Sequence, residues 1–322
     1  MAAASRGDEA PAQDHRFRFG LKLREADDAE AWAEQARRAE AAGFDTVLLP
    51  DHIDYGFAPL PAALAAAQAT SRLRVGTSVL CNDFRHPAIL AKEAATIDRL
   101  SGGRLELGLG AGWMHEDHRK TGIARDPARV RIERLEESLI ILRGLFGQGA
   151  FSHEGAHYRV HELDGHPKPL QAGGPKILVG GGGEKLLGVA ARHADIVGIN
   201  PVARSGVHDA ATDLDASGEA TDRKIEWVRA AAGARFPAIE LACEVFLAEV
   251  AEDPAEADRV LSERYRRPAA EARLVPNALV GSLDALADVL EARRARWGIS
   301  YWILPPNVVE SMAPLVAKLS GR

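Results

Sequence analysis

The sequence predicts an α/β protein with a (β/α)8 TIM barrel fold that carries loop insertions. From residue 18 onward, short apolar runs alternate with amphipathic helical patterns, and this alternation is typical of repeated β-α units with a parallel sheet. Eight such apolar runs occur, which is the strand number of a TIM barrel. The chain has 322 residues, of which 46% are hydrophobic, so it is long enough to bury one large core.

Eight segments are apolar or β-branched and are bounded by turn residues, so we expect them to be the strands. In chain order they cover residues 17–23, 46–50, 73–80, 104–108, 176–180, 196–200, 239–247 and 299–304.

The clearest helix pattern lies between the fourth and fifth expected strands. Its apolar stripe has spacings of three and four residues and consists of Ile132, Leu135, Leu139, Leu142 and Phe146. We expect the polar neighbours to occupy the other face, namely Arg131, Glu133, Arg134, Glu136 and Glu137. Gly43 and Gly298 each follow an amphipathic run and precede an expected strand, and glycine commonly ends a helix at such a position.

We expect a poorly ordered tail over residues 1–16 and a single barrel domain over residues 17–322. The tail mixes charged residues with Ala and Pro, a composition typical of unstructured termini. Two stretches, 147–174 and 249–281, interrupt the β-α rhythm, and the second contains an extra charged helix pattern. Insertions of this kind usually shape a substrate pocket or an interface.

Charge and cysteine content favour a small-molecule partner and a cytoplasmic location. The net charge is -6 and the basic residues are scattered, which gives no footprint for nucleic acid or an anionic membrane. No apolar run approaches the roughly 20 residues that span a bilayer. Cys81 and Cys243 lie far apart, so they predict neither a disulfide framework nor a thiolate zinc site.

Pro50, Asp51 and His52 follow the second expected strand, and catalytic groups of β/α barrels come from such C-terminal strand ends. Histidine side chains titrate close to neutral pH, so His52 is our candidate for proton transfer. Asp51 could orient its ring or a polar edge of a ligand. Alternatively, the side chains of this loop only cap the turn, and for the isolated motif both interpretations are about equally good.

Two glycine-rich segments also follow expected strands. Residues 108–113 read GLGAGW, where glycines would let the backbone approach a flat ligand; the dinucleotide-binding fingerprint is incomplete because Trp113 replaces its third glycine. Residues 180–183 are four glycines before a helix that begins near Glu184, which favours a phosphate site over a flexible turn. No GxxxxGK[ST] motif occurs in the sequence.

The remaining motifs predict neither a metal site nor covalent catalysis. His153, His157 and His161 recur every four residues, but Gly155 and the flanking β-formers favour a strand pair, in which these imidazoles would not form a ligand set. Residues 85–87 precede a helix, with a proline at its first turn as a structural device. No nucleophile lies beside a base in these loops.

Taken together, these motifs resemble the bacterial luciferase-like superfamily across nearly the whole chain after residue 16. The resemblance is carried by residues 50–52, 75–80, 86–87, 92–93, 100–104, 108–113 and 177–183. Within the superfamily, the chain is most similar to the oxidoreductases that use the deazaflavin coenzyme F-420 in place of FMN.

The resemblance implies that the coenzyme ring lies over a bulge at the end of the third strand, with a non-prolyl cis peptide at Ser78-Val79. It implies ring and phosphate contacts from Asp51, His52, Ser78, Val79, Asn82, Gly110, Ala111, Gly112, Gly180, Gly181, Gly182 and Gly183. Tyr55 and Trp113 are assigned to the substrate pocket. All of these contacts require that the segments around residues 51, 78, 110 and 182 meet at one rim of the barrel.

One departure concerns the substrate. The related sugar-phosphate dehydrogenases carry an acidic residue where this chain has Trp113, which favours a less polar substrate that contains a carbon-carbon or carbon-nitrogen double bond. The expected reaction is hydride transfer with coenzyme F-420; the alternatives are an FMN-dependent monooxygenase and a non-catalytic coenzyme-binding paralogue. The resemblance also implies a homodimer.

Overall fold

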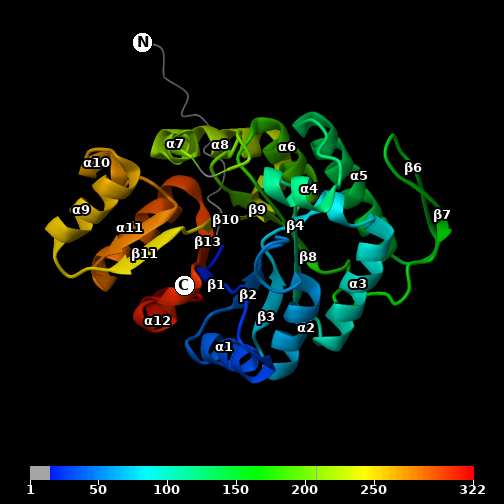
Figure 1. Ribbon diagram of the computed structural model, residues 1–322, viewed down its shortest axis with the longest axis horizontal. Helices are drawn as coiled ribbons and strands as arrows, with labels where there is room; N and C mark the ends of the chain where they lie inside the picture. Colours follow the sequence, from blue (N-terminus) through cyan, green and yellow to red (C-terminus); the bar gives the residue numbers. More distant parts are fainter. Residues whose placement is uncertain (1–14, 208) are drawn as a thin grey trace, which may run out of the picture.

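A computed structural model describes residues 15–207 and 209–322, and these form a parallel barrel surrounded by helices (Figure 1). The eight barrel strands are β1 (Arg18–Lys22), β2 (Thr46–Leu49), β3 (Arg74–Thr77), β5 (Leu105–Gly110), β8 (Lys176–Gly181), β9 (Ile196–Ile199), β10 (Glu240–Glu244) and β13 (Ile299–Leu304). Pairing of β3 with β5 closes the barrel. The predicted fold is confirmed, because each expected strand overlaps one observed strand. Of the expected tail, residues 1–14 lie outside the described residues.

The third expected strand is interrupted. β3 ends at Thr77, and β4 (Leu80–Cys81) resumes the pairing with β5 after a cis peptide bond between Ser78 and Val79. The cis bond that the family resemblance implied is therefore present. The fourth strand was predicted too short, since β5 continues through Gly110 and its glycines belong to the sheet.

Helices cover the outside of the barrel (Figure 1). They are α1 (Ala29–Ala41), α2 (Pro59–Ala69), α3 (Pro87–Leu100), α4 (His115–Thr121), α5 (Ala128–Phe146), α6 (Glu184–His193), α7 (Ala210–Leu214), α8 (Gly218–Ala232), α11 (Leu283–Trp297) and α12 (Val309–Leu319), with 3-10 turns at Asn82–Phe84, Gly233–Ala238 and Pro306–Val308. No helix among the described residues is long and apolar enough to cross a bilayer.

The predicted amphipathic helix is α5, and its stripe is buried at Leu135, Leu139 and Leu142. One assignment to its polar face was wrong, because Arg131 is also buried. The predicted helix end at Gly298 is confirmed, since this residue ends α11 with φ of 75°, a conformation that glycine adopts without steric cost.

The two insertions form separate small sheets. Residues 147–174 contain an antiparallel hairpin of β6 (Phe151–Glu154) and β7 (Arg159–Leu163). The expected strand pair is therefore present, with His153 and His161 in its strands and His157 in the bend between them. The second insertion joins β11 (Leu247–Val250) to β12 (Ala278–Gly281) through α9 (Pro254–Tyr265) and α10 (Ala269–Ala272). The insertions lie on opposite sides of the barrel (Figure 1).

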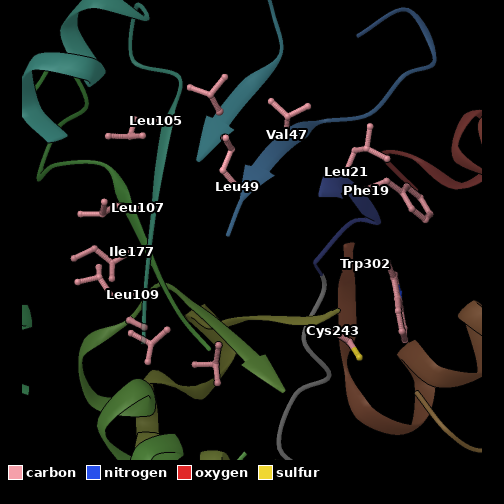
Figure 2. Close-up of a cluster of buried hydrophobic side chains, with 14 of the residues drawn as sticks. Phe19, Leu21, Val47, Leu49, Leu105, Leu107, Leu109, Ile177, Cys243 and Trp302 are labelled. Carbon is pink, nitrogen blue, oxygen red and sulfur yellow. The ribbon is translucent and has the colours of Figure 1, made fainter. Parts of the chain in front are cut away.

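Successive side chains of each strand point to opposite faces of the sheet, so the core has a part outside the barrel and a part inside it. Leu105, Leu107 and Leu109 lie on one side of β5 (Figure 2) and belong to the large cluster packed under the helices. A smaller cluster fills the barrel interior and consists of Leu48, Leu178, Ile196, Ala242, Tyr301 and Ile303. The alternate residues of β5, Glu106, Gly108 and Gly110, therefore face inward.

A buried ion network closes the N-terminal end of the barrel. The Glu106 carboxylate, on a residue 1% exposed, accepts hydrogen bonds from Arg18 at 2.5 Å and from Arg74 at 2.7 Å. Arg18 also donates to Glu240 at 2.8 Å. Burial alone would raise the pKa of Glu106, but the two guanidinium groups hold this pKa below its ordinary value. The network thus compensates the charges that the barrel interior buries.

We expect Glu106→Gln to lower the free energy of unfolding by about 3 kcal/mol, because it removes the buried negative charge that pairs with two half-buried guanidinium groups. Urea unfolding would measure this. Glu310→Gln removes an exposed partner of Arg38 and should change stability by less than about 0.5 kcal/mol.

The contribution of Glu106 to the free energy of unfolding depends on pH, and the pKa of Glu106 fixes the sign of this dependence. Because the folded-state pKa of Glu106 lies below its ordinary value of 4.5, its contribution is complete above that pH and is lost as the pH falls through the folded-state value. The stability gap between wild type and Glu106→Gln should therefore narrow in acid. A gap that widened as the pH fell would contradict this role.

Candidate active site

The segments after β2, β3, β5 and β8 meet at the C-terminal end of the barrel, as predicted. Asp51 accepts a hydrogen bond from the backbone N–H of Cys81 at 2.9 Å. The Val79 side chain lies between two glycines: a Cβ added to Gly110 would be 2.6 Å from one Val79 methyl group, and one added to Gly180 would be 3.4 Å from the other. These contacts join all four segments at one rim.

The glycines of β5 have a packing role that the sequence did not indicate. A Cβ on Gly108 would lie 1.8 Å from the Thr77 carbonyl oxygen, and the space beside Gly110 is filled by Val79. These two glycines therefore admit the neighbouring 77–79 segment. Ser78 is fixed from the other side by its N–H, which donates to the Leu49 carbonyl at 2.8 Å.

His52 is held at this rim by a carboxylate from α4. Its Nδ1 lies 2.8 Å from Asp117 Oδ2, and Asp117 Oδ1 accepts the N–H of Ile53 at 3.2 Å. The imidazole contacts the rings of Tyr55 and Trp113, with centroids 4.7 Å and 5.8 Å away. His52 Nδ1 is thus engaged and its ring orientation fixed, while Nε2 makes no hydrogen bond to the described residues.

The expectation that Asp51 orients His52 was wrong. The Asp51 carboxylate is occupied by Arg85, at 2.5 and 3.1 Å, and by the Cys81 N–H. It braces the start of the 81–85 turn, so Arg85 has a use that the sequence did not indicate. His86 caps the N-terminus of α3 by accepting the Ala88 N–H at 3.2 Å, as expected for a helix start.

Asn82 points toward the hairpin insertion. Its side-chain amide donates to the Tyr158 hydroxyl at 3.4 Å, and the Tyr158 ring contacts the His86 ring with centroids 5.3 Å apart. The hairpin tip is held against α5 because Glu137 accepts the backbone N–H groups of residues 156–158. The first insertion therefore reaches a residue that was assigned to the coenzyme site.

The four glycines lead into an uncapped helix. Gly180 and Gly181 end β8, and Gly183 is the N-cap of α6, which begins at Glu184 as predicted and lacks a side-chain cap. By contrast, Asp28, Ser217 and Ser282 cap α1, α8 and α11. The free N–H groups of the first turn of α6 can donate hydrogen bonds to an anion. No cluster of three or more metal-ligating side chains occurs among the described residues.

Asp117 is the residue of this rim that sequence reasoning missed. It lies four residues after Trp113 and 65 residues after His52, so no local periodicity connects the two. The only available signal was an acidic residue in the first turn of a short helix near a glycine-rich strand end.

We expect Gly110→Ala to lower the free energy of unfolding by about 1 to 3 kcal/mol, since the new methyl group would overlap a Val79 methyl. Denaturant unfolding would measure the loss. Gly183→Ala is the matched control, because nothing lies within 4 Å of the added atom. Adding Val79→Ala should recover part of the Gly110→Ala loss; equal stability of all three variants would rule out this packing role.

Residues 12–300 match the luciferase-like monooxygenase family. Among curated relatives, the FMNH2-dependent dimethylsulfone monooxygenase of Pseudomonas fluorescens is 30% identical over 197 residues, covering 59% of this chain and 53% of that protein. The F-420-dependent glucose-6-phosphate dehydrogenase of Amycolatopsis mediterranei is 34% identical over 159 residues, covering 45% and 48%. The alignments thus span about half the length of these relatives.

Solved structures share the fold over nearly the whole chain. An F-420-dependent secondary alcohol dehydrogenase in complex with an F-420-acetone adduct has a TM-score of 0.73 at 19% identity, covering 94% of this chain and 99% of that chain. The monooxygenase RslO1 from Streptomyces bottropensis has a TM-score of 0.70 at 24% identity, covering 94% and 97%. The match over residues 12–300, together with the closed eight-stranded barrel, shows that this chain belongs to the luciferase-like monooxygenase family.

Proposed function

We propose that this protein is an oxidoreductase that transfers a hydride between coenzyme F-420 and a small, weakly polar organic substrate. The observation that carries the proposal is the His52–Asp117 hydrogen bond at the barrel mouth, with Nδ1 and Oδ2 2.8 Å apart. Homologues that use F-420 and homologues that use FMN both occur in the family, and the chemistry of the mouth supports a role in two-electron transfer.

The coenzyme site in this proposal has a ring part and a phosphate part. The residues that would hold the ring are Asp51, His52, Ser78, Val79, Asn82 and residues 110–112. Residues 180–183 would hold a phosphate at the uncapped start of α6, where free N–H groups and the helix dipole favour an anion. The bound deazaflavin would supply the hydride donor or acceptor.

His52 would exchange the proton that accompanies the hydride. In the oxidative direction, a substrate C–H bond breaks with its electron pair and the proton on the neighbouring atom moves to His52 Nε2; reduction reverses both transfers. Asp117 supports this role because its hydrogen bond to Nδ1 leaves Nε2 available.

The walls around His52 favour a weakly polar substrate. Tyr55 and Trp113 contact the imidazole and remain 37% and 40% exposed. Exposed aromatic rings beside a half-buried proton-transfer group offer apolar surface to a substrate. An indole in place of a carboxylate argues against sugar-phosphate recognition.

We expect the purified protein to bind oxidised coenzyme F-420 and to bind FMN more weakly, as measured by calorimetry or by the change in the coenzyme absorption spectrum. The Gly183→Ala protein is expected to fold and to lose phosphate-dependent affinity only slightly, because glycine and alanine both leave the N–H groups of α6 free. Tight binding of FMN with no binding of F-420 would instead favour the FMN-dependent monooxygenase.

We expect His52→Ala to reduce turnover about 100-fold or more while the dissociation constant of the coenzyme changes little, as is usual for a general acid-base group. Asp117→Asn should reduce turnover less, because it weakens the hydrogen bond that fixes the imidazole but leaves the imidazole in place. Steady-state kinetics and coenzyme titration separate these effects. A loss below about threefold for His52→Ala would exclude the proton-transfer role, and an inactive wild type that still binds coenzyme would favour a non-catalytic paralogue.

A further inference from the structure

Arg131 is a buried cation whose hydrogen bonds to the described residues all go to backbone carbonyl groups. The residue is 5% exposed, and its guanidinium forms no ion pair within 15–207 and 209–322. Nη1 donates to the carbonyl oxygens of Ala111, at 2.6 Å, and Gly112, while Nε donates to that of Asp126 at 3.0 Å. An arginine stays protonated in proteins, so a positive charge lies directly behind the end of β5.

These hydrogen bonds determine where two peptide N–H groups point. In a trans peptide, the C=O and N–H bonds are antiparallel. Because Arg131 on α5 binds the Ala111 and Gly112 carbonyls, the N–H groups of Gly112 and Trp113 point away from α5 and toward the barrel axis. Neither N–H donates to an acceptor in the described part of the chain.

Close packing around Gly112 restricts the conformation of this segment. Gly112 has φ of +72°, and an added Cβ would lie 2.6 Å from Cys81 Sγ and 3.3 Å from His118 Nε2. The Trp113 ring contacts the His52 ring at 5.8 Å between centroids, so the two free N–H groups lie at the same mouth as the proposed coenzyme ring.

We propose that Arg131 is a positioning residue that turns the N–H groups of Gly112 and Trp113 into a binding site for the negative charge of the reduced coenzyme ring. This inference rests on the proposed function. Transfer of a hydride from the substrate to the oxidised ring, without a proton, adds one negative charge, which the ring would delocalise onto its nitrogen and carbonyl oxygen atoms. Fixed N–H dipoles backed by a buried cation stabilise this added charge, so they favour the reduced ring over the oxidised ring.

The test compares the dissociation constants of oxidised and reduced coenzyme F-420, measured without oxygen. Arg131→Met should weaken binding of the reduced form about tenfold and of the oxidised form less than about threefold, because hydrogen bonds to charged groups are the stronger ones. A tenfold fall in the ratio of the oxidised-form dissociation constant to the reduced-form dissociation constant lowers the midpoint potential of the bound coenzyme by about 30 mV. The matched control is Arg129→Met on the same helix, where Arg129 is exposed and pairs with Glu133.

Each result bears on either the inference or the proposed function. Equal weakening of both redox forms by Arg131→Met would overturn the role of Arg131 and leave the proposed function intact, whereas a wild type that binds neither form would overturn the proposed function itself. If Arg131→Met does not fold, Arg131→Lys provides the test. Its single ammonium group keeps the positive charge but cannot reach all three carbonyls. The ratio of the oxidised-form dissociation constant to the reduced-form dissociation constant should therefore fall about threefold. An unchanged ratio in a folded Arg131→Lys protein would overturn the inference.

Discussion

The mouth of the barrel depends on close packing of the 77–79 segment against bare backbone. Thr77 and Val79 occupy the space that side chains at Gly108 and Gly110 would need, and Val79 reaches Gly180 on the next strand. These contacts bring three strand ends within van der Waals distance. A larger residue at Gly108 or Gly110 would separate the elements on which the candidate site is built.

Charged side chains fix the orientation of the groups at the barrel mouth. Asp117 on α4 orients His52, Arg85 fixes Asp51, and Arg131 on α5 holds the carbonyls of the β5 extension. Each of these groups is buried or half-buried, so its hydrogen bonds are less screened than they would be in water. The orientation of the site is therefore supplied by helices and turns, while the strands supply its position.

Family membership and local chemistry answer different questions about this protein. Relatives in the family include an FMNH2-dependent monooxygenase and an F-420-dependent dehydrogenase, so one barrel accommodates both coenzymes and both reactions. In this chain, loops at the barrel mouth bring Tyr55 and Trp113 into contact with His52, and the hairpin insertion contacts Asn82 through Tyr158.

The sequence by itself determined the barrel, the order of its strands, the end of α11 at Gly298 and the meeting of four strand ends at one rim, because these follow from local periodicity and from the direction of parallel strands. The partner of His52, the burial of Arg131 and the reason for the β5 glycines were decided only by the tertiary structure. Asp117 is 65 residues from His52, and Asp51 is 34 residues from Arg85. Such partners are chosen by distance in space and by competition for hydrogen bonds, which residue spacing along the chain does not encode.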